Sequence, residues 1–296
     1  MNRPSDFLLI ERINQCPKLA SLRSINQTLE ALLESEDSFM AQIAEVIRLD
    51  PSLTTRVLDL VNSIFFGSKE DQRISGVEEA SIFLGLNRIK ELLAATPVIE
   101  EIFKLGKNST NFPWVDFWRH SIGVAILTRE ILSLANEEFE QEEDYIAGLL
   151  HNLGILIIAI TFPEHFQSVY GKKYNSLSSL LEKEIESVGW NHAKVGAYYL
   201  WNHHISEEVV EGVHWHNEPE KASINPKLAA AIQVADYLTK QLNVEGMEKT
   251  GSIKPNLQFE LSGWNILFGE IEEQEEIREE LSFAVDRLSQ TLQGII

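Results

Sequence analysis

The stretch Leu149-Leu150-His151-Asn152-Leu153-Gly154 lies inside an apolar run that extends from Tyr145 to Phe162. The run approaches the length of a membrane span, but it contains a histidine, an asparagine and two glycines, and it lacks basic flanks. We therefore expect it to form the buried central helix of a soluble protein. A buried His-Asn pair either satisfies its own hydrogen bonds and those of the backbone or contributes ligands to a cation.

A second histidine is predicted to face the protein interior from the segment 114–136. His120 lies on the same helical row as Val124, Leu127 and Ile131, which predicts a helix with this imidazole on its buried side. We therefore expect His120 to contact other side chains rather than solvent.

A carboxylate occupies an apolar helical stripe farther along the chain. Asn225-Pro226 is a good N-cap and first-turn pair, and Leu228, Ile232 and Asp236 follow it at intervals of four residues. A buried carboxylate costs on the order of several kcal/mol unless it is paired or bound to a cation. Asp236 therefore needs a partner, which is one of the buried histidines, a backbone amide or a metal ion.

Six stretches of the chain, in this order and spacing, resemble the bacterial HDOD domain, a branch of the HD superfamily of metal-dependent phosphohydrolases. They are Ile43–Leu58, Val61–Gly67, Ala80–Lys90, Phe117–Ser121, Ala147–His151 and His192–Gly196. The resemblance covers roughly residues 5 to 243. Domains of this kind often sit in bacterial signalling proteins, and many have lost ligands of the HD site.

The resemblance implies an all-α fold of two packed helical subdomains, of which the C-terminal one is an HD-like helical bundle. In the HD superfamily a His from one helix, a His-Asp doublet from the next helix and a distant Asp bind the first metal. His120, His151 and Asp236 match these ligands, while His192 and His216 match auxiliary positions. The cofactor implied by the resemblance is a divalent metal: iron, manganese, nickel or zinc.

Two positions depart from the pattern of active members. Asn152 stands where the doublet has an aspartate, and Ile155 stands where many active members have a lysine. Asparagine offers only a neutral oxygen, which weakens both metal affinity and the stabilisation of a metal-bound hydroxide. His192 follows Asn191 at a predicted helix start and His216 precedes a polar turn, so both also have purely structural interpretations.

Helix start signals recur along the chain, and its sequence lacks the alternation typical of strands. We divide it into an N-terminal helical subdomain at residues 1–105, an HD-like subdomain at 106–243, and a loop with an acidic C-terminal helix at 244–296. Pro97 is expected to kink or end a helix. Asn62, a polar residue near an otherwise apolar helix end, leads to the hypothesis that it holds the two halves together.

Composition limits the partners. A formal net charge of −20 argues against binding to nucleic acid or to an anionic membrane, because both require a basic surface. The single Cys16 rules out a disulfide within the chain, so a reducing cytoplasm is expected. Signalling proteins are the expected partners, and a homo-oligomer is left open.

Two classes of function follow. The sequence favours a non-catalytic signalling or regulatory module that acts by ligand or protein-partner binding. The alternative is a metal-dependent phosphohydrolase acting on a nucleotide or phosphate ester, with His120, His151 and Asp236 as metal ligands. Asn152 and Ile155 weigh against the enzyme without deciding the matter.

Overall fold

A computed structural model of the chain describes residues 3–16, 23–35, 39–65, 73–94, 114–137, 142–242, 260–269 and 274–292. All regular structure within these ranges is helical, and no strand occurs among them. The predicted all-α class is therefore confirmed. Pro97 and the predicted domain boundaries near residues 105 and 243 lie outside or at the edge of the described residues, so the exact division of the chain stays a prediction.

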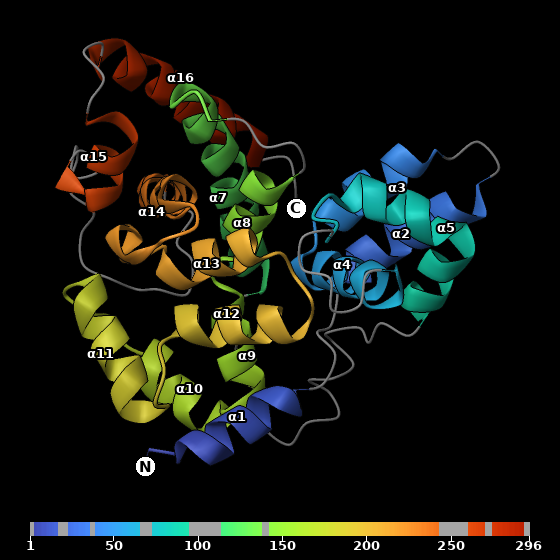
Figure 1. The fold of residues 1–296 in the computed structure, drawn as a ribbon, viewed down its shortest axis with the longest axis horizontal. Coiled ribbons are helices and arrows are strands. Elements are labelled where there is room, and N and C mark those ends of the chain that lie inside the picture. The colour runs from blue at the N-terminus through green and yellow to red at the C-terminus, as the bar shows by residue number, and fades with distance from the viewer. Residues whose placement is uncertain are drawn as a thin grey trace.

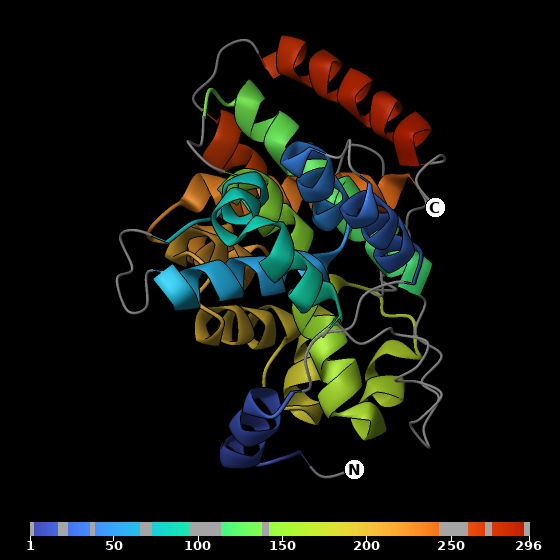
Figure 2. The ribbon, with the colours of Figure 1, turned by 90° about the vertical axis from the view of Figure 1, so that its right-hand side faces the viewer.

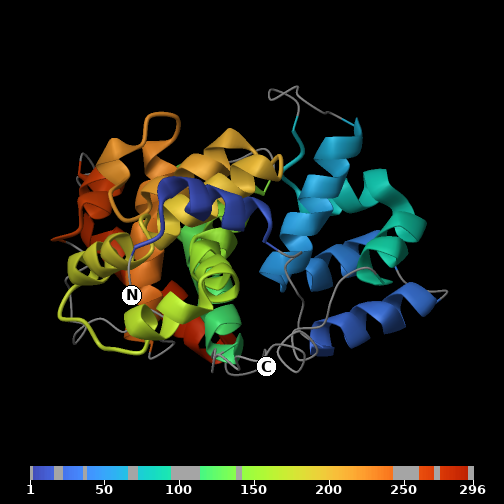
Figure 3. The ribbon, with the colours of Figure 1, turned by 90° about the horizontal axis from the view of Figure 1, so that it is seen from below.

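The helices form an N-terminal group and a larger body (Figure 1). The N-terminal group contains α2 (Arg23–Glu34), α3 (Met40–Arg48), α4 (Pro51–Phe65) and α5 (Val77–Ala94). The body contains α1 (Asp6–Asn14), α7 (Trp114–Leu134), α8 (Glu143–Leu150), α9 (Leu153–Thr161), α10 (Pro163–Tyr170), α11 (Leu177–Ser187), α12 (His192–Asn202), α13 (Glu207–Trp215), α14 (Pro226–Gln241), α15 (Ser262–Phe268) and α16 (Gln274–Leu292). Seen from below, the group α2–α5 lies to one side of this body (Figure 3).

The N-terminal group is built on amphipathic helices with clear start signals. Asp50 is fully buried, and its Oδ1 accepts hydrogen bonds from the amides of Ser52 at 2.8 Å and Leu53 at 3.1 Å. These bonds satisfy two of the amides that a helix start leaves without partners, so α4 begins at Pro51 as its sequence predicts. Helix α5 changes direction at Gly85, whose φ of 72° lies in the left-handed region that favours glycine.

Helix α14 lies at the centre of the body, with α7, α8, α13 and α15 around it (Figure 1). Its buried residues include Ala229, Ala230, Ala231 and Ala235, whose small side chains allow neighbouring helices to approach closely. Helix α16 packs along α7 at one edge (Figure 2) and buries its stripe of Ile277, Leu281, Ala284 and Leu288. This arrangement places polar side chains of α7, α8 and α14 in one interior.

The prediction of a single central helix from Tyr145 to Phe162 is wrong. The chain forms α8 and α9, with His151 and Asn152 in a turn between them. A Cβ on Gly154, just after this turn, would lie 1.9 Å from the backbone oxygen of His192, so the glycine permits α9 to touch α12. The segment Glu143–Thr161 is apolar enough to cross a membrane, but 83% of its most apolar window is buried, as in the core of a soluble protein.

Three further elements differ from expectation. Helix α10 lies within residues 162–178, which the sequence predicts to be a linker, and α15 lies within 244–296, for which the sequence predicts only a loop and one acidic helix. Helix α1 packs against α9 and α12 instead of joining α2–α5. Arg12 of α1 donates to the backbone oxygen of Thr161 at 3.1 Å and also pairs with Glu164. The first helix therefore belongs to the larger body.

Candidate functional site

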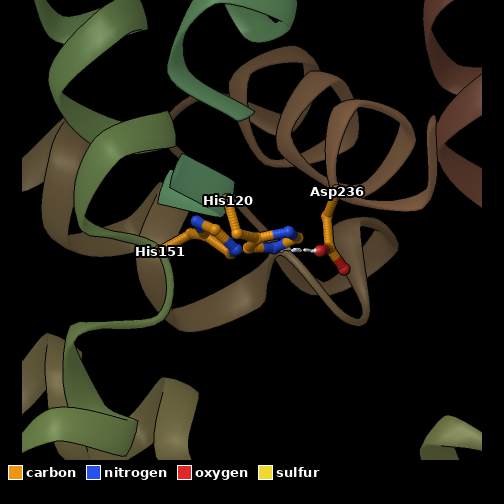
Figure 4. Close-up of side chains that lie close together, drawn as sticks. All are labelled: His120, His151 and Asp236. Carbon is orange, nitrogen blue, oxygen red and sulfur yellow. Dashed lines mark ion pairs between the residues drawn. The ribbon is translucent and has the colours of Figure 1, made fainter. Parts of the chain in front are cut away.

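Three helical segments bring His120, His151 and Asp236 together (Figure 4). His120 Nε2 lies 2.9 Å from Asp236 Oδ1, and His151 Nε2 lies 3.7 Å from the same oxygen. The ligand-type atoms of the three residues all lie within 4.8 Å of one another, and all three side chains are buried. Residues separated by more than a hundred positions thus form one compact polar cluster.

Hydrogen bonding fixes the orientation and tautomer of His151. Its Nδ1 donates to the backbone oxygen of Gly148 at 2.7 Å, so its Nε2 presents a lone pair toward Asp236. Burial lowers the pKa of His151, and this outweighs the opposing effect of the Asp236 carboxylate. A neutral imidazole with one nitrogen bonded to a backbone carbonyl is the usual arrangement of a metal-binding histidine.

Close helix contacts hold this geometry. A Cβ on Gly148 would lie 2.8 Å from the Cα of Ala125 in α7, so this glycine allows α8 to approach the helix that carries His120. Gly154 plays the same role between α9 and α12, at whose start His192 lies. The glycines that flank the His-Asn pair therefore set its depth in the protein.

The two auxiliary histidines extend the cluster into a row. The ring centroids of His151 and His216 are 5.4 Å apart, and those of His216 and His192 are 5.6 Å apart. His216 donates from Nδ1 to the backbone oxygen of Val213 at 2.8 Å, and its Nε2 accepts from the Asn217 amide at 3.0 Å. Burial, with two neighbouring histidines, lowers the pKa of His216 to about 3, so its ring is neutral.

A carboxylate that the sequence analysis missed ends the row beside His192. Glu184 is fully buried, and both of its oxygens lie 2.9 Å from His192 Nδ1. It also accepts from the His192 amide at 2.8 Å and from the Tyr170 hydroxyl at 2.6 Å. Its signal was available, because Leu180 and Glu184 share one helical stripe.

Asn152 supplies no charge to the row. It is 1% exposed and begins α9 without a side-chain cap bond. Its Oδ1 is buried and has no hydrogen-bond partner within the described ranges. The amide therefore leaves Asp236 as the one anionic group among the matched first-metal positions.

Lys240, a second residue that the sequence analysis missed, lies on the other side of Asp236. Its Nζ is 2.6 Å from Asp236 Oδ2, and the lysine is only 7% exposed. Burial acts to raise the pKa of Asp236, but Lys240 and His120 outweigh it and hold this pKa well below the ordinary value. The spacing was a signal, because Lys240 continues the four-residue stripe of Ile232 and Asp236.

These residues fit a divalent metal in geometry but not in charge. Two imidazole nitrogens and one carboxylate oxygen suit manganese, iron, nickel or zinc. The single negative charge of Asp236, however, is already balanced by the Lys240 ammonium, and Asn152 adds none. A dication would therefore meet no net negative charge from the matched ligands, Asn152 and Lys240, and the further carboxylate of the row, Glu184, lies at its far end beside His192.

The all-helical body with its buried His-His-Asp cluster defines an HD-like helical domain. The family profile of the HDOD domain matches residues 19–219, and the chain therefore belongs to the HDOD family. This finding confirms the resemblance read from the six sequence stretches.

Solved structures share this fold. The MmoQ response regulator of Methylococcus capsulatus has a TM-score of 0.68 at 19% identity, over 91% of this chain and 98% of that protein. A virulence factor of Campylobacter jejuni has a TM-score of 0.65 at 19% identity, and the match covers 95% of this chain and 96% of that protein. An HDOD domain protein of unknown function from Geobacter sulfurreducens has a TM-score of 0.57 at 22% identity, and the match covers 98% of this chain and 97% of that protein. At these identities the likeness concerns the fold alone.

One relative is longer than this chain. An uncharacterized protein of Treponema pallidum (strain Nichols) is 24% identical over 240 residues, which cover 80% of this chain. The match spans only 44% of that relative.

Proposed function

We propose that this chain is a regulatory HDOD module that acts by binding a signalling protein and does not turn over a substrate at its polar row. The observation that carries the proposal is the burial of the row. His120, His151 and His192 are 0% exposed, and His216 is 1% exposed.

Burial of this degree suits a structural role better than hydrolysis. A catalytic metal keeps an open coordination position, and a phosphate ester must reach it through a cleft. Here His151 and His216 donate from Nδ1 to backbone carbonyls, His192 Nδ1 bonds to Glu184, and His120 lies at ion-pair distance from Asp236. The row therefore serves to hold α7, α8, α12, α13 and α14 together. The binding of a signalling protein then takes place on the outer surface of the domain.

The signalling context is supported by both surface charge and fold. A formal net charge of −20 favours a protein partner with a basic docking face, because complementary charge speeds and orients association. MmoQ, which shares the fold, is described as a response regulator. The single cysteine fits a cytoplasmic location.

One observation favours the alternative of a metal-dependent phosphohydrolase. His120, His151 and Asp236 present their ligand-type atoms within 4.8 Å of one another, which is the layout of a first metal site. We rank this alternative second because Asn152 and Lys240 leave the pocket without the negative charge that a catalytic dication needs.

An assay with phosphate esters separates the two. Wild type and the folded variant Asp236→Asn are incubated with p-nitrophenyl phosphate, bis-p-nitrophenyl phosphate and a cyclic dinucleotide, each with added Mn²⁺ or Zn²⁺. We expect both proteins to give the same background rate. Turnover by wild type that Asp236→Asn loses would overturn the regulatory proposal in favour of the enzyme.

A further inference from the structure

Lys240 occupies a place in the core that lysine seldom takes. Its side chain is 8% exposed, and its Nζ lies 2.6 Å from Asp236 Oδ2, one helical turn earlier on α14. A buried ammonium is costly unless an anion accompanies it, and Asp236 is the anion to which it is bound.

Both oxygens of Asp236 lie close to cationic or polar groups of this chain. Oδ2 receives the Lys240 ammonium at 2.6 Å, and Oδ1 lies at the ion-pair distance of 2.9 Å from His120 Nε2, without the geometry of a hydrogen bond. A metal ion bound to Oδ1 would lie close to the positive charge of the Lys240 ammonium, which is already paired with the other oxygen of the same carboxylate. Between a metal ion and an ammonium group roughly 4 to 6 Å apart, the repulsion amounts to several kcal/mol even at an effective dielectric constant of about 20.

We propose that Lys240 is the resident cation of this site, neutralising Asp236 in place of a divalent metal, so that the wild-type pocket is stable without metal and rejects it. The proposal deepens the function proposed above for the same site and rests on it. Asn152 and Lys240 act together, because one withholds a negative charge and the other adds a positive charge.

The proposal predicts how to restore a metal site. Asn152→Asp adds one negative charge and Lys240→Met removes one positive charge, so the double variant gains the two charges that balance a dication. Methionine keeps an unbranched chain of similar length and fills the space that the lysine stem leaves. Neither substitution changes the three ligand-type residues His120, His151 and Asp236.

The test compares wild type, both single variants and the double variant, with Mn²⁺ and Zn²⁺ as probes. Metal content is measured by elemental mass spectrometry after desalting, and melting temperature is measured in EDTA and in added metal. Lys227→Met is the matched control, because Lys227 pairs with Glu137 at the surface.

We expect wild type and Lys227→Met to retain no stoichiometric metal and to melt at the same temperature in EDTA and in metal. We expect Lys240→Met to melt lower in EDTA and to regain stability in metal, since a ligand that binds only the folded state stabilises it. The double variant should bind metal roughly a hundredfold more tightly than wild type.

Two results would overturn the inference. One is wild type that carries a full equivalent of metal and melts lower in EDTA. The other is a folded double variant that takes up no more metal than wild type. Lys240→Gln replaces the methionine variant if the latter does not fold, and the same results then decide. Metal in wild type would leave the regulatory function standing, because that function fails only on turnover of phosphate esters.

Discussion

The amide nitrogen of Asn62 in α4 donates to the backbone oxygen of His204, 142 residues farther along the chain, at 3.1 Å. The same nitrogen donates to the Ile74 backbone oxygen at 2.9 Å, and Asn62 Oδ1 accepts from the Ile74 amide at 2.8 Å. Nearby, Arg73 donates to the backbone oxygen of Ile205 at 2.9 Å. The corner between α12 and α13 is thus bonded to the N-terminal group, as the hypothesis for Asn62 anticipated.

We predict that Asn62→Ala lowers the free energy of unfolding by about 2 kcal/mol, because it leaves buried backbone groups without their partners. Urea denaturation measures the change. Asn202→Ala is the control, since Asn202 bonds to Asn14 at an exposed position and its loss should cost much less. Equal stability of Asn62→Ala and wild type would mean that the junction does not depend on this amide.

Gly154 should tolerate no side chain. A Cβ there would lie 1.9 Å from the His192 backbone oxygen and 2.7 Å from the Gly196 amide nitrogen, so α9 and α12 would have to separate. We expect Gly154→Ala to destabilise the fold by about 3 kcal/mol or more in thermal unfolding. Gly76→Ala is the matched control, because its Cβ would meet no atom closer than 3.8 Å. Similar melting temperatures for the two variants would contradict the close contact.

The Glu211 carboxylate should stabilise the folded protein at neutral pH and lose this effect in acid. Burial acts to raise its pKa, but hydrogen bonds from the amides of Ser223, Asn225 and Ile224 and from the Ser223 hydroxyl outweigh burial and lower it. A lowered folded-state pKa contributes stability above the ordinary value of 4.5, and this contribution is lost as pH falls through the folded-state pKa.

Chemical denaturation of wild type and Glu211→Gln, from pH 7 down to below pH 4.5, tests whether the Glu211 carboxylate stabilises the fold. The variant should be less stable at pH 7, and the difference should narrow as the pH falls below 4.5. A difference that stays constant with pH would show that the charge of Glu211 does not contribute.

Tyr170, Glu184 and His192 should behave as one unit. Glu184 accepts from the Tyr170 hydroxyl at 2.6 Å and from His192 at 2.9 Å, all within the core. We expect Glu184→Gln to cost about 3 kcal/mol and Tyr170→Phe about 1 kcal/mol. In a double-mutant cycle the two costs should fall short of additivity by about 1 kcal/mol, because both variants remove the same hydrogen bond. Strict additivity would contradict the network.

Periodicity predicted the helical class and the inward direction of His120, because the pattern of apolar residues around a helix is local information. It failed at His151-Asn152, where apolar residues continue on both sides of the turn and hide the break between α8 and α9. The burial of Lys240 and Glu184 was not predicted, for a different reason. A charged residue on a helix is ordinarily solvated, and only the packing of α14 and α11 reveals that these two are enclosed.

The position of α1 has a consequence for the topology of the chain. The group α2–α5 follows α1 and precedes α7 in the chain, and both of these helices are anchored in the larger body. The group is therefore an insertion between two helices of the larger body and is joined to that body at both of its ends. Helix α7 carries His120, and α12, on which α1 packs, begins at His192. The two helices that border the inserted group in the chain thus belong to opposite ends of the row of buried histidines, α7 through His120 and α1 through its packing on α12.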